Sequence, residues 1–168
     1  VQAYFERMQL PAGAFHMNFT SNHDENSWNG TEMERMGEAR FTLAVMAATI
    51  QGMPLVYNGQ ETSLDRRLKF FDKDSINWDK MDLVDFYTRL LHLHQTNPAL
   101  AVGLQQSTPK FLSSKDQKDV LIYTREQGTS KVLVVLNLSA QAKKVTLRAA
   151  AAGTYKNLFS DKKETLKD

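Results

Sequence analysis

The sequence lacks cysteine altogether: none of its 168 residues carries a thiol. A disulfide framework, a cysteine-ligated zinc site and a thiol nucleophile are therefore excluded. Long apolar runs are missing as well, because none approaches the roughly 20 residues that a membrane-spanning helix needs. We therefore expect no membrane partner for this chain.

The chain also lacks an initiator methionine and a secretory leader pattern, because it opens at Val1 in VQAYFERMQL. Such a start is what we expect from an internal segment of a longer protein. What is present fits a folded domain: 42% of the residues are hydrophobic, 10% are aromatic and 24% are charged. The chain can therefore bury a sizeable core, and this composition argues against disorder.

Charge is unevenly distributed although the net charge is only +2. Residues 1–104 hold 13 acidic and 9 basic side chains, whereas residues 105–168 hold 6 acidic and 12 basic ones. A basic second half can indicate nucleic-acid binding, but its lysines are scattered and no RRM, KH or helix-turn-helix signature accompanies them. We expect no nucleic-acid partner.

Two short apolar runs flank a helical pattern in the first part of the chain. Residues 14–20 (AFHMNFT) and 54–57 (PLVY) lie between turn-forming residues, as buried strands do. Between them, Thr31 and Glu34 form a capping-box pattern ahead of apolar residues at helical spacing, which predicts one helix over about 32–50. The order strand, helix, strand predicts parallel neighbours with a right-handed crossover.

The segment after the second run is too long for a simple connection. Residues 59–80 include Asp65-Arg66-Arg67 and the pair Phe70-Phe71, and a loop of this length is typical of a functional or docking role. Apolar spacing then predicts a helix over about 82–96, which Asn97-Pro98 ends.

Beyond residue 104 the hydrophobic period changes to two. Residues 120–125, 131–138 and 143–147 are β-rich runs separated by turn formers, and residues 153–158 add a fourth run. Short strands at this spacing are typical of an antiparallel sandwich or meander, so we expect no helix there. The change of period divides the chain into segments 1–104 and 105–168.

The densest polar cluster, FTSNHDENSW, occupies residues 19–28, after the first predicted strand. Sites are built at the carboxyl ends of strands in strand–helix units, so His23 and Asp24 are candidates for chemistry. The competing interpretation, favoured by spacing alone, is a polar turn in which His23 or Asp24 fixes backbone amides. A metal site through these residues and Glu25 is disfavoured, because adjacent residues of an extended segment point to opposite sides and neither HExxH nor an EF-hand loop is present.

Several motifs together resemble the α-amylase family, glycoside hydrolase family 13. FTSNHD at 19–24 is similar to the F-x-x-N-H-D segment that ends the seventh barrel strand, and GMPLVYNGQE at 52–61 is similar to the eighth-strand pattern G-x-P-x-x-Y-x-G-x-E. INWD at 76–79 and LHQTNPAL at 93–100 resemble what commonly follows in these enzymes.

The resemblance implies a fold for the whole chain. Residues 1–104 would be the C-terminal part of a catalytic (β/α)8 TIM barrel, namely strands 7 and 8 with their helices. Residues 105–168 would be an antiparallel β-sandwich C-terminal domain. We expect this domain to be incomplete, since residues 162–168 are polar and end where the family adds closing strands. The implied class is therefore α/β plus all-β.

The resemblance also implies roles for individual residues. The family aspartate that matches Asp24 stabilises the transition state, and the histidine that matches His23 contacts the same sugar. Hydrogen bonds to ring hydroxyls that tighten in an oxocarbenium-like state can supply several kcal/mol. Asn22 and Trp28 are further substrate-binding candidates. For Asn22 we favour holding the turn over holding the sugar, and for Trp28 packing competes with a sugar platform.

Retaining hydrolysis requires two carboxyl groups about 5 Å apart. In the family the nucleophilic aspartate lies in an R-x-D segment after the fourth strand and the acid/base glutamate follows the fifth, and neither has a match here. Asp65 and Glu25 cannot take these roles, because they follow the wrong strands. We expect the C-terminal portion of a hydrolase of α-glucans such as starch, maltooligosaccharides or cyclodextrins, and we expect this portion alone to be inactive.

Two other functions fit the sequence less well. A non-catalytic carbohydrate-binding or interaction module could keep a sugar contact through His23, Asp24 and Trp28. A P-loop or dinucleotide enzyme is excluded, because neither GxxxxGK[ST] nor GxGxxG follows a strand. We expect no cofactor in this chain. Calcium in the full-length protein, a secreted or periplasmic location in a bacterium, and the choice between hydrolysis and glycosyl transfer stay open.

Two barrel strands without their neighbours would leave unpaired sheet edges and uncovered helix faces. We expect the chain to self-associate or to be only marginally stable. The apolar side chains expected to lack part of their cover are Met36, Phe41, Leu83, Phe86 and Leu90.

Overall fold

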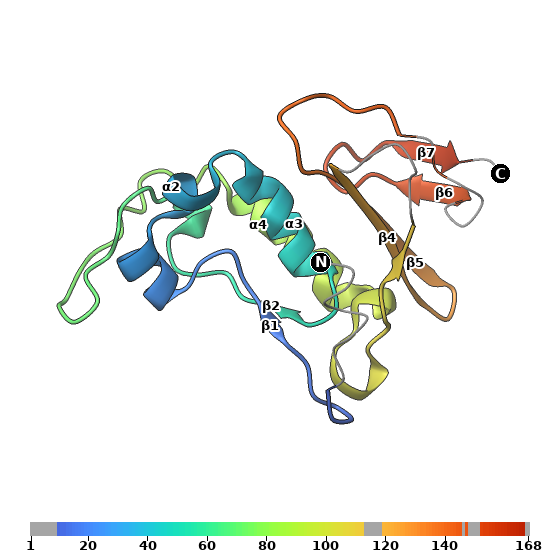
Figure 1. Ribbon diagram of the computed structural model, residues 1–168, viewed down its shortest axis with the longest axis horizontal. Coiled ribbons are helices and arrows are strands. Elements are labelled where there is room, and N and C mark those ends of the chain that lie inside the picture. The colour runs from blue at the N-terminus through green and yellow to red at the C-terminus, as the bar shows by residue number, and fades with distance from the viewer. Residues whose placement is uncertain (1–9, 113–118, 146, 148–151, 167–168) are drawn as a thin grey trace.

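The computed structural model describes residues 10–112, 119–145, 147 and 152–166. It places a helical part and a long loop at one end of the molecule and the β-rich part at the other (Figure 1). Within the described residues, no helix combines the length and the apolar character needed to cross a membrane.

Strands β1 (Met17–Asn18) and β2 (Met53–Pro54) form a two-stranded parallel sheet. The main-chain N–H of Met53 donates to the carbonyl of His16 at 2.8 Å. The helical segment between these strands makes the connection a crossover, so the predicted order of strand, helix and parallel strand is confirmed.

Both strands are shorter than the apolar runs predicted. The first run is also less buried than expected, because Phe15, Met17 and Phe19 are each at least 41% exposed. Side chains at alternate positions of a strand point to the same face of the sheet, and the face that carries Phe15, Met17 and Phe19 is open to solvent. The prediction that the whole run 14–20 is a buried strand is wrong.

The helix predicted between the strands is divided into α2 (Glu32–Met36) and α3 (Ala39–Thr49). The capping box is present, since Thr31 Oγ1 accepts from the Glu34 N–H and Glu34 Oε2 accepts from the Thr31 N–H. Gly37 then takes φ 54° and ψ −137°, a conformation that a residue with a Cβ rarely adopts. The single-helix prediction is wrong at this glycine, whose backbone freedom outweighs the helical spacing around it.

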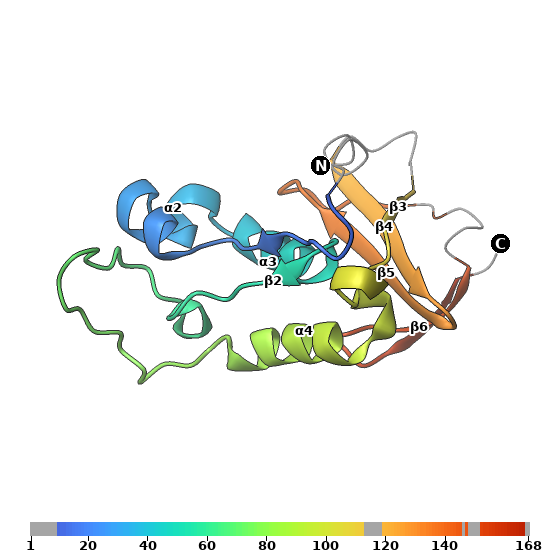
Figure 2. The same ribbon diagram turned by 90° about the horizontal axis from the view of Figure 1, so that it is seen from below.

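Helix α4 (Val84–Thr96) lies within two residues of its predicted bounds. Asn97 ends it and begins the short 3₁₀ turn η3 (Pro98–Leu100), with the Asn97 side chain accepting from the Ala99 N–H at 3.0 Å. Helices α3 and α4 pack against each other (Figure 2). Leu90 is consequently only 1% exposed, so the expectation that it lacks part of its cover is wrong.

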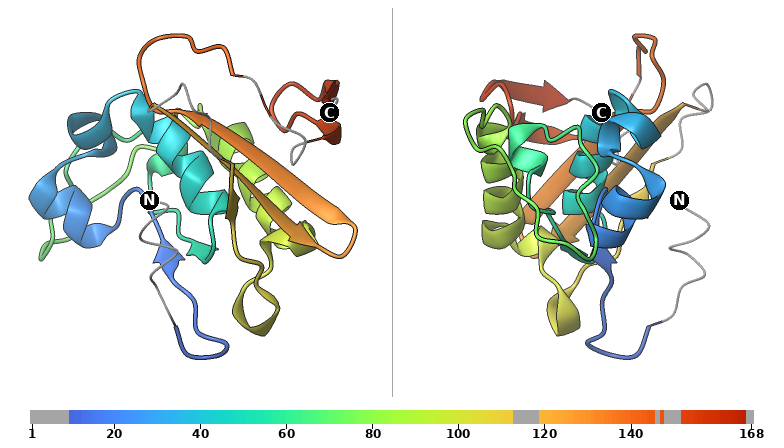
Figure 3. Two further views of the ribbon diagram at one scale, coloured as in Figure 1. Left: turned by 45° about the vertical axis from the view of Figure 1, so that its right-hand side comes forward. Right: turned by 90° about the vertical axis from the view of Figure 1, so that its left-hand side faces the viewer.

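The second half contains two antiparallel sheets. Strands β3 (Lys110–Phe111), β4 (Val120–Gln127) and β5 (Ser130–Asn137) form one sheet in that order. Strands β6 (Gly153–Lys156) and β7 (Lys163–Leu166) form a separate hairpin (Figure 3).

The β pattern was predicted unevenly. Strands β4 and β5 confirm the runs at 120–125 and 131–138, and no helix interrupts them. Strand β7 was not predicted. In the run 143–147, residues 143–145 and 147 lie outside the strands, and Thr146 lies outside the described residues. A 3₁₀ turn, η4 (Gly103–Gln105), precedes the β-rich half.

The main hydrophobic core lies where the two halves meet. Ile50 and Leu100 come from the helical half, and they pack with Tyr123, Val134 and Leu136 of the β4–β5 hairpin. The two halves therefore share one core. The division of the chain into two domains at residue 104 stays a prediction.

Candidate functional site

His23 and Asp24 lie together just beyond the carboxyl end of β1. They occupy a helical turn that continues into the π-helix η1 (Glu25–Asn29). His23 Nε2 lies 3.5 Å from Asp24 Oδ2, and the two side chains are 66% and 57% exposed. The pair therefore presents an imidazole and a carboxylate to solvent side by side.

Asn22 holds the turn that carries this pair. Its Oδ1 accepts a hydrogen bond from the Glu25 N–H at 2.7 Å, and its carbonyl accepts one from the Asn26 N–H at 2.9 Å. These bonds agree with the interpretation of Asn22 as a turn residue. Its contact with a sugar stays a prediction.

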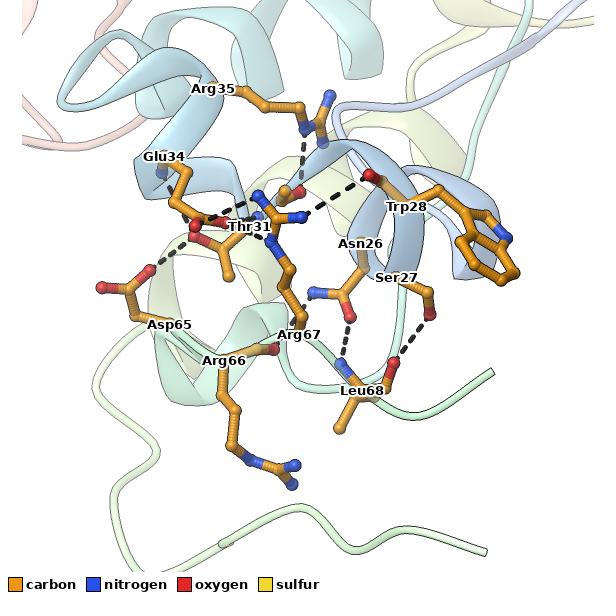
Figure 4. Close-up of polar contacts among 11 residues, drawn as sticks. Asn26, Ser27, Trp28, Thr31, Glu34, Arg35, Asp65, Arg66, Arg67 and Leu68 are labelled. Atoms are coloured by element: carbon orange, nitrogen blue, oxygen red, sulfur yellow. Dashed lines mark hydrogen bonds and ion pairs between the residues drawn. The ribbon is translucent and has the colours of Figure 1, made fainter. Parts of the chain in front are cut away.

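The buried side chain of Asn26 fastens the long loop after β2 to this turn (Figure 4). Asn26 Nδ2 donates to the Arg66 carbonyl at 3.2 Å, and Asn26 Oδ1 accepts from the Leu68 N–H at 2.7 Å. Ser27 Oγ donates to the Leu68 carbonyl at 2.8 Å. The Asn26 side chain thus bonds to the loop main chain on both sides of Arg67, at one carbonyl and one N–H, as the main chain of a neighbouring strand does.

Side chains of α2 hold the same loop from a second direction. Arg67 donates to Glu34 through Nε at 2.9 Å and through Nη2 at 3.2 Å. Hydrogen bonds from Arg67 and from the Thr31 N–H lower the pKa of the Glu34 carboxyl. Thr31 Oγ1 donates to Asp65 Oδ1 at 2.5 Å. Glu34 and Thr31 therefore cap the helix and fix the loop together.

A bidentate ion pair closes the tip of the loop. Arg66 donates to Asp74 Oδ2 through Nη1 at 2.8 Å and to Asp74 Oδ1 through Nη2 at 3.1 Å. The main-chain N–H of Lys69 donates to Asp74 Oδ2 at 2.9 Å. These donors, Arg66 first, hold the pKa of Asp74 well below its usual range. The closed tip contains Phe70 and Phe71.

Gln60 anchors the base of this loop to the segment that follows β1. Its buried Nε2 lies 2.9 Å from Thr20 Oγ1 and 3.0 Å from Tyr87 Oη, and its Oε1 accepts from the Tyr57 N–H at 2.6 Å. Burial is the main cause that raises the pKa of Tyr87. The segments that follow β1 and β2 are thereby joined to helix α4 through one side chain.

The carboxylate next to Asp24 in the sequence has a structural role. Glu25 Oε2 lies 3.3 Å from Arg35 Nη1. Arg35 also donates to the Thr20 carbonyl at 2.7 Å and to the Gly30 carbonyl at 3.0 Å. Among the described residues, no group of three histidine, cysteine or acidic side chains is placed to hold a metal ion.

Trp28 lies on the exposed side of this region, in contact with two rings that sequence reasoning did not assign. The Trp28 centroid lies 5.1 Å from that of Phe70 and 6.1 Å from that of Phe71. Phe70 also stacks with His23 at 5.7 Å and 28°. In the sequence, only the adjacent phenylalanines Phe70 and Phe71 inside a long polar loop indicated an aromatic surface. The sequence pattern does not show which other rings they contact.

Comparisons with known proteins agree with the motifs. Residues 110–166 match the family model described as Maltogenic Amylase, C-terminal domain. Over 159 residues the chain is 28% identical to Alpha-amylase 2 of Dictyoglomus thermophilum, covering 86% of this chain and 25% of that protein. It is 32% identical over 93 residues to a Cyclomaltodextrinase of a Bacillus species, covering 53% of this chain and 16% of that protein.

A solved structure has a fold similar to that of this chain. The structure described as a noncanonic maltogenic alpha-amylase AmyB from Thermotoga neapolitana matches with a TM-score of 0.76 at 24% identity, covering 96% of this chain and 39% of that one. That structure shows a similar fold, and the family model and the two curated relatives confirm the resemblance to the α-amylase family. The chain spans a quarter or less of the two curated relatives described here.

Proposed function

We propose that this chain is the C-terminal part of a retaining glycoside hydrolase that acts on α-glucans. The observation that carries the proposal is the exposed His23–Asp24 pair at the carboxyl end of β1. Relatives named as an α-amylase and a cyclomaltodextrinase support the substrate class. Strand carboxyl ends are where barrel enzymes build their active sites.

The architecture proposed for residues 10–104 is the last two strand–helix units of a (β/α)8 barrel. The parallel pairing of β1 with β2 and the helices that follow each strand support it. The sheets from β3 to β7 then correspond to the C-terminal β-sandwich, which the family match over 110–166 supports.

In this mechanism Asp24 is the transition-state stabiliser. Its exposed carboxylate can accept hydrogen bonds from two hydroxyls of the sugar beside the scissile bond. As positive charge develops on that ring, the hydroxyls become better donors and the bonds strengthen, which lowers the barrier without forming a covalent bond. His23, whose imidazole lies beside this carboxylate, contacts the same sugar.

We also propose that the chain alone does not turn over substrate. A nucleophile and an acid are needed as a pair, and the nearby carboxylates of Glu25 and Asp65 are bonded to Arg35 and Thr31. A highly purified sample should release no chromophore from a chromogenic maltooligosaccharide. Turnover that co-purifies with the chain through every step would contradict this.

The role of Asp24 is tested in the full-length protein with Asp24→Asn. The amide cannot accept charge-assisted hydrogen bonds on both atoms, so kcat should fall by several orders of magnitude while the unfolding midpoint is retained. Asp82→Asn, at an exposed carboxylate at the start of the α4 region, is the control and should keep the wild-type kcat. A raised KM with unchanged kcat would exclude a transition-state role.

A non-catalytic carbohydrate-binding module is the second candidate. The exposed rings of Trp28 and Phe71 beside the polar pair favour it, because sugar-binding surfaces combine these groups. The wild-type arm of the Asp24→Asn experiment discriminates the two functions. A full-length protein that binds α-glucan but shows no turnover even with Asp24 intact would support the module.

A further inference from the structure

Four aromatic rings form a continuous surface beside Asp24. His23 and Trp28 follow β1, and Phe70 and Phe71 lie in the tip of the loop after β2. The contacting ring centroids lie between 4.8 and 6.1 Å apart. We call this set the ring platform. Trp28 is 56% exposed and Phe71 is 85% exposed.

The exposed position of Phe71 does not stabilise the folded chain. Burying apolar surface is worth about 25 cal/mol per Å², and this ring forgoes most of that gain. It also lies in a long loop without regular secondary structure, and such loops are usually functional. An exposed phenyl ring that touches two other rings is instead arranged for contact with something outside the chain.

The ring platform is held in place before any ligand arrives. The loop main chain is bonded to Asn26 on both sides of Arg67. The Arg66–Asp74 ion pair closes the segment that carries the two phenylalanines. Because the rings are already ordered, binding a ligand costs little conformational entropy. Even a small contact area can then give measurable affinity.

We propose that the ring platform binds the apolar face of a glucosyl unit of an α-glucan, adjoining the unit that Asp24 contacts. The inference rests on the proposed function and names Phe70 and Phe71 as substrate-positioning residues of the same site. A sugar ring offers a C–H face that packs on an aromatic ring and a hydroxyl edge that hydrogen-bonds. The His23 stack on Phe70 makes the surface continuous from the rings to the carboxylate.

The polar groups at the edge of the ring platform favour an α-glucan over a second copy of the chain as the ligand. A second copy of the chain, docked by an apolar surface, would take the Asp24 carboxylate out of water without giving it donors. Burying a charge unpaired costs more than the burial of a few rings returns. A glucan supplies hydroxyl donors at the same place where it covers the rings.

The proposal is tested on this chain with maltoheptaose as the probe. The chain has two tryptophans, so Trp78→Phe leaves Trp28 as the sole tryptophan reporter. In that background, sugar binding should change the Trp28 emission in a saturable way, and Phe71→Ala should raise Kd about threefold to tenfold. Phe159→Ala, at an exposed phenylalanine in the turn between β6 and β7, is the matched control and should leave Kd unchanged.

The outcomes separate the platform from the proposed function. A Kd unchanged by Phe71→Ala overturns the platform, and so does the absence of saturable binding by the wild-type ring set. If Asp24→Ala still weakens binding in the first case, the sugar contact of the proposed function stands without the platform. If Phe71→Ala lowered the unfolding midpoint and left Kd unchanged, the rings would serve packing only.

Discussion

Arg125 of strand β4 donates a hydrogen bond from Nη1 to the carbonyl of Ile50, the residue that caps helix α3, at 3.0 Å. The Arg125 side chain is fully buried and also donates to the Ala101 carbonyl at 3.2 Å and to Ser107 Oγ at 3.1 Å. A cation at a helix C-terminus meets the negative end of the helix dipole. This arginine therefore joins the two halves of the chain through main-chain carbonyls.

The first prediction concerns this junction. Arg125→Met keeps much of the apolar stem but removes the guanidinium donors, which leaves the buried Ile50 carbonyl and the partly buried Ala101 carbonyl without this partner. Each unsatisfied buried acceptor costs about 1–3 kcal/mol, so the free energy of unfolding should fall by about 3 kcal/mol. Urea denaturation measures it.

Lys156→Met is the control for the Arg125 prediction. Lys156 forms an exposed ion pair with Asp161 at 2.6 Å, and such pairs contribute about 0–1 kcal/mol. A loss in Arg125→Met no larger than in Lys156→Met would mean that the junction does not depend on the guanidinium.

The second prediction concerns Asn26 and the loop it holds. Asn26→Ala removes both bonds to the loop main chain, so the Leu68 amide should exchange with solvent at least about tenfold faster, corresponding to about 1.4 kcal/mol of local opening. Hydrogen exchange measured by mass spectrometry resolves this segment. Asn29→Ala removes only the exposed 3.2 Å bond to Glu25 and should leave Leu68 exchange unchanged; equal acceleration in both variants would contradict the assigned role.

Local signals in the sequence predicted local structure well. The capping box needs only Thr31 and Glu34, which are three residues apart, so reading the sequence was enough to place the start of α2. The end of α4 follows from Asn97-Pro98 for the same reason. The parallel pairing of β1 with β2 followed from a general rule on chain crossovers.

Contacts between distant segments could not be predicted in this way. Asn26 and Leu68 lie 42 residues apart, and their bonds depend on the path of a loop that no periodic pattern describes. The ring platform depends on the same path. The sequence motif identified His23 and Asp24 as candidates, whereas Phe70 required knowledge of where the loop returns.

The third prediction compares two glycines with positive φ. Gly37 (φ 54°) has open space where a Cβ would lie, so Gly37→Ala should cost only backbone strain, about 1–2 kcal/mol. At Gly52 (φ 124°) an added Cβ would lie 2.6 Å from the His16 carbonyl oxygen. Because that carbonyl accepts the bond pairing β1 with β2, Gly52→Ala should cost about 3 kcal/mol or more. Thermal unfolding of both variants checks the order, and a smaller loss at Gly52 would exclude the close approach.

The fourth prediction is a pH dependence that arises from His94. Its Nδ1 lies 2.9 Å from the Ala48 carbonyl, which can only accept, so the neutral ring donates there. Burial, and to a lesser extent the charge of Arg125, lowers the pKa of His94 below its usual 6.5. At pH values between the pKa of His94 in the folded chain and 6.5, the unfolded chain binds more protons than the folded chain. The contribution of His94 to the free energy of unfolding is therefore fully present above pH 6.5 and is lost as the pH falls through this window.

Unfolding free energies between pH 5 and 7.5 test the His94 prediction. The fall toward pH 5 should be present in the wild type and reduced in His94→Gln, which removes the titrating group. His92→Gln, at an exposed position on the same helix, should retain the wild-type slope. A wild-type stability that is flat across this range would contradict a half-buried, neutral His94.

The last prediction is that the chain self-associates through β1. Phe15, Met17 and Phe19 are exposed at alternate positions, and the described strands leave one edge of β1 without a partner. An exposed apolar strand edge is a template for pairing with another chain. Sedimentation velocity at micromolar concentrations should therefore show a concentration-dependent rise in mass. Met17→Lys places a charge on this face and should shift the chain toward the monomer, whereas Leu138→Lys, at an exposed leucine just beyond β5, should not. If the wild type remains monomeric at every concentration tested, β1 is covered in solution by other residues of the same chain.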